Sequence, residues 1–151
     1  MAPRPPSQGP RMFTVEEANE LVPDLTLAFG RLGRLRGEAS AHVEALGGGD
    51  LAMAVLEGGE APAGHETTAR RLRGLVEEIN AVVEQVNEMG CLVKDIDAGL
   101  VDFYGVRDGE PVFLCWQFGE PAVAHWHPVE AGFAARQPIE GVSIEPPPFP
   151  N

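Results

Sequence analysis

Apolar residues recur at helical spacing through the first half of the chain and at strand spacing through the second. Up to about Gly90 they follow a seven-residue rhythm, whereas beyond it apolar and polar residues alternate. The first pattern is typical of amphipathic helices and the second of half-buried strands. We therefore expect an α+β protein in which long helices precede a small antiparallel sheet.

The first helix is predicted to begin after Thr14, whose side chain can cap it. Glu17 follows three residues later and completes a capping box, and Phe13 precedes the cap, where a hydrophobic staple begins. Pro23 interrupts this helix, because proline lacks the N–H that an inner turn needs. Two alternatives stay open: the helix kinks at Pro23, or a second helix begins there with the proline in its first turn.

Two apolar seams continue beyond Pro23 and predict a long antiparallel helical hairpin, coiled-coil-like in its spacing. The first arm carries Leu25, Leu32, Ala39 and Leu46 on one seam and Leu21, Ala28 and Leu35 on the other, and the second arm, about 67–89, carries Leu72, Ile79 and Val86. Gly90 stands where a helix-terminating glycine is expected. The apolar stripe of the second arm is wider than a two-helix seam, so we expect the hairpin to form a homodimer.

The chain divides into one predicted domain and two tails. Residues 13–139 form a single α+β domain, and within it the glycine-rich stretch 47–66 is expected to be mainly a flexible loop, with one or two helical turns over Leu51–Leu56 as the alternative. Residues 1–12 are expected to be a disordered N-terminal tail. Residues 140–151 form a proline-rich C-terminal tail.

A hairpin turn at Asp108-Gly109 is the strongest strand signal. Counting outward from this turn pairs Phe103 with Leu114 and Asp102 with Cys115. With a third strand at about 122–127, these segments predict a small antiparallel three-stranded β-meander. The turn at 119–121 decides the faces: an odd-length loop places His125 and His127 with Asp102 and Cys115, and an even-length loop places them on the opposite face.

The spacing of His125 and His127 is the main chemical signal. Residues two apart in a strand project to one face, and two imidazoles so placed can share a divalent metal such as Zn, Mn or Ni. The residues that could complete the site are acidic or thiol side chains of the same segment: Asp95, Asp97, Asp102, Glu120 and Cys115. The alternative is an ordinary strand face, with the aspartates solvated or paired to Lys94 and Arg136. A Cys115–His125 nucleophilic pair also stays open under the odd register.

Composition narrows the classes of partner. The chain has 151 residues and a formal net charge of -12, and residues 91–151 carry nine acids against three basic residues. An excess of negative charge argues against nucleic acid and against an anionic membrane as partners. No stretch of about 18 apolar residues could span a bilayer. Two cysteines and no secretory signal favour a cytoplasmic location with free thiols.

Several short strings together resemble a known family. They are Phe13–Asn19, Gly90-Cys91, Lys94–Phe103, Leu114-Cys115-Trp116, Gly119-Glu120, Trp126-His127, Gly132–Ala134 and Arg136–Pro138. The chain resembles, over about residues 13–139, the prokaryotic family of unknown function DUF2203. The resemblance implies a small cytoplasmic protein with no established activity. The matching polar positions are Lys94, Asp95, Asp97, Asp102, Glu120, His127 and Arg136, while His125 is less typical of the pattern.

Two functional hypotheses follow. The first is a non-catalytic cytoplasmic module that self-associates through its helical hairpin, because no nucleophile elbow, phosphate loop or dinucleotide fingerprint is present. The second is a divalent-metal-binding protein or a metal-dependent hydrolase. It would use His125 and His127 with the acidic residues Asp97, Asp102 and Glu120.

Overall fold

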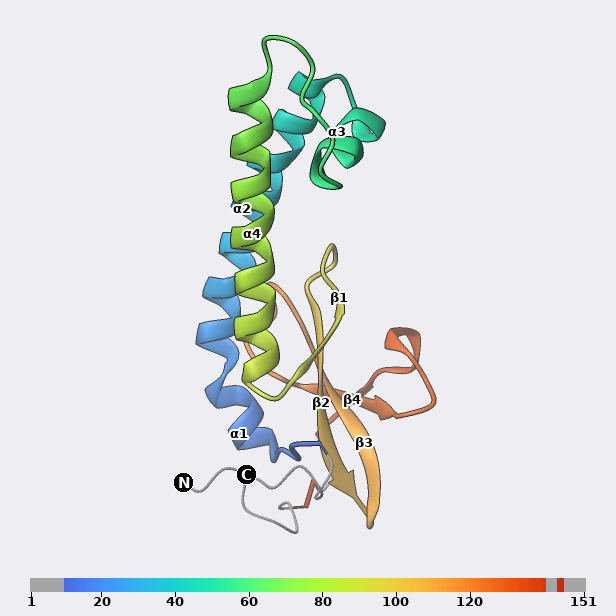
Figure 1. Ribbon diagram of the computed structural model, residues 1–151. Coiled ribbons are helices and arrows are strands. Elements are labelled where there is room, and N and C mark those ends of the chain that lie inside the picture. Colours follow the sequence, from blue (N-terminus) through green and yellow to red (C-terminus); the bar gives the residue numbers. More distant parts are fainter. Residues whose placement is uncertain (1–9, 141–143, 146–151) are drawn as a thin grey trace. The chain divides into compact units, whose positions relative to one another are not determined.

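The computed structural model describes residues 10–140 and 144–145, and this part of the chain is an α+β structure. It contains four α-helices followed by a five-stranded antiparallel sheet (Figure 1). The described residues form two compact units. One consists of the residues up to Leu27 together with those from Gln85 onward, and the other spans Ala28–Glu84.

The capping box at Thr14 is confirmed, and Pro23 separates two helices. Helix α1 spans Val15–Glu20, with the Thr14 hydroxyl accepting from the Glu17 N–H at 3.1 Å and the Glu17 carboxylate accepting from the Thr14 N–H at 2.9 Å. Leu21 ends α1, and α2 spans Val22–Leu46. Pro23 therefore lies in the first turn of a new helix, where its missing N–H removes no helical hydrogen bond.

The stretch predicted mainly as a flexible loop contains a helix, which corrects the main prediction and agrees with the alternative for Leu51–Leu56. Helix α3 spans Gly49–Leu56 and buries Ala52 and Val55, which pack with Leu46 and Leu72. The Arg73 guanidinium donates to the carbonyls of Val55 and Gly59, so α3 is tied at its end. The flanking glycines weakened the helical signal in the sequence. Ala52 and Val55 are three residues apart and therefore lie on one face of α3, and burial of that face alone stabilises a short helix.

The last helix, α4, spans Glu66–Glu88, within one residue of the prediction. In the unit Ala28–Glu84, α4 is joined to α2 by the ion pairs Arg71–Glu38 at 2.9 Å and Arg31–Glu78 at 3.8 Å. As one residue number rises along α2, its partner's number falls along α4, so the two helices run antiparallel in this unit. None of the described helices is both long and apolar enough to cross a membrane.

The sheet has five strands where the sequence predicted three. The strands are β1 (Leu92–Asp95), β2 (Leu100–Arg107), β3 (Glu110–Gln117), β4 (His125–Pro128) and β5 (Gln137–Pro138), and they pair in chain order. The predicted β2–β3 register is confirmed, with Asp102 opposite Cys115 and Phe103 opposite Leu114. Strands β1 and β5 are four and two residues long, too short to show an alternating pattern.

Hydrogen bonds to the rest of the chain hold Arg11 and Glu145, which lie in the two predicted tails, and Phe13, the first residue of the predicted domain. The Phe13 N–H donates to the Tyr104 carbonyl at 2.7 Å, and the Glu145 N–H donates to the Val106 carbonyl at 2.8 Å. The Arg11 guanidinium donates to the Met89 carbonyl at 2.7 Å. The predicted disorder of residues 1–12 therefore does not extend to Arg11. The part of β2 beyond β1 offers the unpaired backbone groups to which Phe13 and Glu145 bind. Residues 1–9, 141–143 and 146–151 lie outside the described residues.

Both faces of the central strands are buried. One face carries the predicted apolar set, in which Val101, Phe103, Leu114 and Trp116 are fully buried. The other face buries Asp102, Phe113, Cys115 and His127 as well. The segment after β4 includes the short 3₁₀ helix η2 (Phe133–Ala135), which contacts β4. Polar groups on the second face are thus removed from water, and they need partners within the protein.

Candidate metal centre

The register of β4 decides which side chains the two histidines meet. His125 lies opposite Cys115 and His127 lies opposite Phe113. Because Asp102 lies opposite Cys115 on β2, all four polar side chains project to the same face. The structure therefore has the odd-length connection, the alternative that brings the histidines to the side of Asp102 and Cys115.

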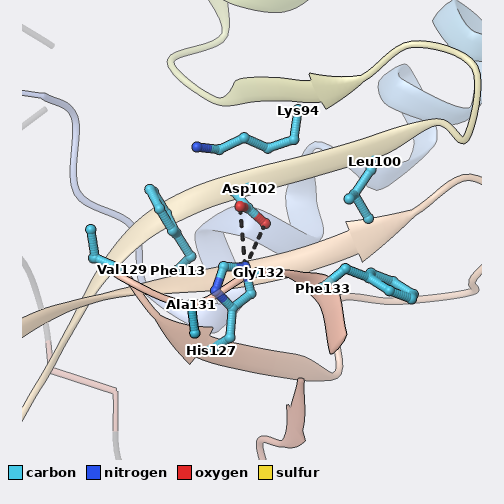
Figure 2. Close-up of a pocket in the computed structure, with 9 residues that line it drawn as sticks. All are labelled: Lys94, Leu100, Asp102, Phe113, His127, Val129, Ala131, Gly132 and Phe133. Atoms are coloured by element: carbon cyan, nitrogen blue, oxygen red, sulfur yellow. Dashed lines mark hydrogen bonds and ion pairs between the residues drawn. The ribbon is translucent and has the colours of Figure 1, made fainter. Parts of the chain in front are cut away.

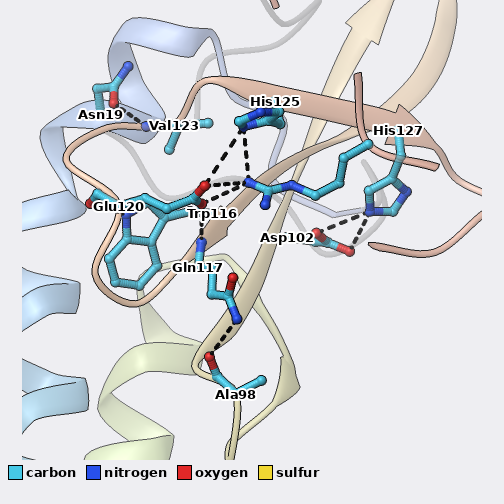
Figure 3. A network of polar contacts seen from close by, with 10 residues as sticks. Asn19, Ala98, Asp102, Trp116, Gln117, Glu120, Val123, His125 and His127 are labelled. Atoms are coloured by element: carbon cyan, nitrogen blue, oxygen red, sulfur yellow. Dashed lines mark hydrogen bonds and ion pairs between the residues drawn. The ribbon is translucent and has the colours of Figure 1, made fainter. Parts of the chain in front are cut away.

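Contacts within the connection of seven residues between β3 and β4 fix this register (Figure 3). It opens with a turn in which the Glu120 N–H donates to the Gln117 carbonyl, and Gly119 has a φ of 102° that suits glycine. The Glu120 carboxylate accepts from the Gln117 N–H at 2.6 Å, and the Asn19 side chain of α1 accepts from the Val123 N–H at 2.7 Å. The loop is held at both ends before β4 begins.

Three buried side chains from three adjacent strands meet on this face. They are Asp102 of β2, Cys115 of β3 and His127 of β4, and one ligand atom of each lies within 4.8 Å of the other two. The three residues are 3 %, 0 % and 2 % exposed. A carboxylate oxygen, a sulfur and an imidazole nitrogen are the donor types that zinc sites use.

The hydrogen bonds of His127 identify the nitrogen that faces the cluster. Its Nδ1 lies 2.8 Å from the Pro128 carbonyl, which can only accept, so Nδ1 carries a proton. Its Nε2 lies 3.2 and 3.3 Å from the two Asp102 oxygens. A neutral imidazole with its proton on Nδ1 presents the lone pair of Nε2 to this carboxylate, which is repulsive unless a proton or a metal ion lies between them.

Cys115 is held as a thiol in the absence of a metal. Burial, together with the neighbouring Asp102 carboxylate, raises the pKa of Cys115 to about 12, against a smaller opposing effect of Arg136. Cys91 is buried elsewhere, and burial raises its pKa to about 11. Both cysteines are free thiols. A metal at Cys115 would have to displace its proton.

His125 belongs to a separate polar network. The Arg136 guanidinium donates to the Glu120 carboxylate at 2.7 and 2.9 Å and to His125 Nδ1 at 3.1 Å. Because a guanidinium has no acceptor, Nδ1 of His125 must accept, and its lone pair is thereby used. Glu120 also holds the β3–β4 connection, so this network orders the loop.

The structure thus brings together two of the five predicted metal ligands, Asp102 and His127. His125 and Glu120 lie in the Arg136 network, and Asp97 is exposed in the turn between β1 and β2. Cys115 completes the buried cluster. The hairpin register already placed Cys115 opposite Asp102, so the sequence held a signal for this neighbour. No sequence signal indicated that Arg136 would bind Glu120 and His125.

A pocket of about 230 Å³ borders the cluster (Figure 2). Its walls are mostly apolar and include the charged or polar side chains of two cluster residues and one lysine: the lining residues are Lys94, Leu100, Asp102, Phe113, His127, Val129, Ala131, Gly132 and Phe133. The Lys94 ammonium lies 4.5 Å from the centre of the Phe113 ring. No local pattern in the sequence indicated this pocket, since its lining comes from four separate segments.

Comparison with known proteins identifies a family and no activity. Searches among curated proteins and among solved structures found no match to this chain. The model of the family described as an uncharacterized conserved protein, DUF2203, matches residues 11–139. This match agrees with the resemblance carried by the sequence strings, and it covers the helices, the sheet and the buried cluster. The chain therefore belongs to the DUF2203 family.

Proposed function

We propose that Asp102, Cys115 and His127 bind a divalent transition metal, with Zn²⁺ as the best fit. The observation that carries this proposal is the buried meeting of the three donor atoms within 4.8 Å. The bond from His127 Nδ1 to the Pro128 carbonyl supports it, because metal-binding histidines commonly donate their other N–H to a backbone carbonyl.

The distances suit a small tetrahedral ion. Bonds of about 2.0–2.3 Å in a tetrahedral site place neighbouring ligand atoms roughly 3.3–3.7 Å apart. His127 Nε2 already lies 3.2 Å from an Asp102 oxygen. A mixed set of sulfur, nitrogen and oxygen favours Zn²⁺, whereas Mn²⁺ prefers oxygen donors. A shift of the Cys115 side chain toward the other two would complete the geometry.

Three protein ligands leave one position of a tetrahedral ion open. Asp102 and His127 both line the pocket, so the open position would face it. Catalytic zinc sites have this form, and a water bound there has a pKa near 7. Metal-dependent hydrolysis is the activity that such a site would support.

Metal content tests the proposal directly. Protein produced without an affinity tag is exposed to Zn²⁺, dialysed and analysed for bound metal, and we expect one equivalent. The Co²⁺ form should show thiolate-to-cobalt charge transfer. Cys115→Ser should remove both signals, whereas Cys91→Ser, which changes the other buried cysteine, should preserve them. Sub-stoichiometric zinc in the wild type, or equal binding by the two variants, would refute the metal site.

A second proposal concerns the helical part, which would self-associate as a coiled-coil-like homodimer. Large apolar side chains on its surface support this: Leu27 of α2 is 74 % exposed, and Leu51 and Met53 of α3 are about half exposed. The wide stripe of α4 supports it less, because α3 covers part of it. Light scattering across the micromolar range should give twice the chain mass of 16.2 kDa. A monomer mass throughout would exclude the dimer.

We also infer a cytoplasmic location and no nucleic-acid or membrane partner. The support is the net charge of -12 and the two cysteines held as free thiols, which suit a reducing compartment. Fractionation of cells that express the full chain is the test, and recovery with the membrane fraction or in an exported fraction would contradict it.

A further inference from the structure

The pocket beside the cluster combines one cation with apolar walls. Lys94 lies at an irregularity of β1, where the pairing with β2 shifts between Val93 and Asp95. Its ammonium rests over the Phe113 ring, and within the described part of the chain no carboxylate lies within ion-pair distance of it. Figure 2 shows Lys94 on the opposite side of Asp102 from His127. An anion that enters the pocket would meet a cation that is not already neutralised.

We propose that this pocket binds a small monocarboxylate with a compact apolar body. Its carboxylate would lie between Lys94 and the open metal position, and its body would pack on Phe113 and the apolar residues that follow β4. The inference rests on the metal site proposed above, and it names the class of ligand for that site.

The sum of the charges around the pocket supports a ligand with a single negative charge. With the metal bound, the two positive charges of zinc and the one of Lys94 meet one negative charge on Asp102 and one on the Cys115 thiolate. One positive charge remains, and a monocarboxylate neutralises it. A phosphate dianion would need several donors, but Lys94 is the only cationic side chain among the described residues that line this pocket.

The volume of the pocket supports a ligand whose apolar part is compact. The pocket volume is about 230 Å³, and an apolar cavity of about 150 Å³ is enough to hold benzene. A benzene ring with a carboxylate therefore fits. Ligands the size of drugs or nucleotides need pockets of about 300–1,000 Å³, more than this pocket provides.

Benzoate is a suitable probe, and benzamide is its uncharged counterpart of the same shape. Zinc content is measured first on the same full-length sample, and binding is then followed by calorimetry. We expect saturable benzoate binding to the zinc form, with benzamide and the zinc-free protein each weaker by at least about tenfold. Lys94→Met should weaken benzoate binding by about 10- to 100-fold, the value of one charge-assisted hydrogen bond, and Lys94→Arg should retain most of it.

Arg107 provides the matched control, since its guanidinium also rests over an aromatic ring, that of Trp126, and it does not line this pocket. Arg107→Met should leave benzoate affinity unchanged. Lys94 is also the only lysine in the chain, so its ¹³C-methylated amine gives a single lysine signal that should move when benzoate binds. This second measurement holds even if Lys94→Met fails to fold.

The two proposals fail in distinguishable ways. If zinc binds but benzoate does not saturate, or binds no better than benzamide, the carboxylate inference is wrong and the metal site stands. Equal affinity in wild type and Lys94→Met with an unmoved Lys94 signal gives the same result. If zinc does not bind, both proposals fail.

Discussion

His125 and His127 lie two residues apart on the same face of β4, yet they differ in burial and in partners. The His127 side chain is 3 % exposed and faces Asp102, whereas the His125 side chain is 34 % exposed and faces Arg136 and Glu120. Around His125, the Glu120 carboxylate and His125 Nδ1 both accept hydrogen bonds from the Arg136 guanidinium. Around His127, Nε2 faces the Asp102 carboxylate, an arrangement that either a proton or a metal ion between them completes.

This comparison shows that residue type and spacing do not make a site. Both histidines satisfied the strand rule for a shared metal ligand pair, but the guanidinium of Arg136 occupies the lone pair of one of them. What distinguishes His127 is the set of groups that the fold places around it. Substitutions in the two histidine environments should therefore have different effects on stability and on metal binding.

Removing the carboxylate from each environment should have very different costs. In metal-free protein, Asp102→Ala leaves the buried His127 without its partner and should lower the free energy of unfolding by about 3–5 kcal/mol. Glu120→Ala breaks more hydrogen bonds, but its side chain is 25 % exposed and water can replace some of them, so we expect about 1–2 kcal/mol. Urea denaturation measures both values. Equal losses of unfolding free energy in the two variants would show that the two histidine environments do not differ in this way.

Zinc should stabilise the protein through one histidine only. At about 100 times the dissociation constant, a metal that binds only the folded state adds about 2.7 kcal/mol, which is roughly 5–10 °C in Tm for a chain of this size. His127→Gln should lose this stabilisation, and His125→Gln should keep it. Thermal unfolding with and without Zn²⁺ is the measurement. A loss in both variants would mean that the predicted pair of histidines does act together.

The two buried thiols should make metal-free protein sensitive to alkali. The pKa of Cys91 is raised to about 11 and that of Cys115 to about 12, so above about pH 9 the unfolded state loses protons that the folded state keeps. The stabilisation is fully present below pH 9 and declines as the pH rises toward these values. Each cysteine should account for roughly 1 kcal/mol between pH 8 and pH 10.

Denaturation in reducing buffer at these two pH values, with Cys91→Ala and Cys115→Ala as references, isolates each thiol. Bound zinc should abolish the contribution of Cys115 to the pH dependence of the unfolding free energy, because the metal already holds this side chain as a thiolate. The contribution of Cys91 to this pH dependence should persist. A pH response that zinc leaves unchanged would count against Cys115 as a ligand.

The smallest effect is expected at His125 itself. His125→Gln retains an acceptor for Arg136, and the position is partly exposed, so the free energy of unfolding should change by less than about 1 kcal/mol. Chemical denaturation without metal is the test. A change as large as that for Asp102→Ala would show that the Arg136 network is as important to the fold as the buried cluster.

The sequence predicted the elements whose signals are local. The capping box of Thr14, the end of α4 before Gly90 and the turn at Asp108-Gly109 each depend on a few neighbouring residues, and all are observed. The β2–β3 register followed from the turn alone. Strands β1 and β5 escaped prediction, and helix α3 was predicted only as an alternative, because all three are short and depend on partners distant in the sequence.

By itself, then, the sequence determined the α+β order, the helix ends and the pairing of Asp102 with Cys115. Only the tertiary structure decided which histidine joins them. A one-residue change in the β3–β4 connection would turn both histidines to the other face. The hydrogen bonds of Glu120 and of Asn19 fix that connection, and they come from side chains that no local pattern relates. The Arg136 guanidinium donates a hydrogen bond to His125, and His127 lies with the buried Asp102 carboxylate and Cys115 thiol.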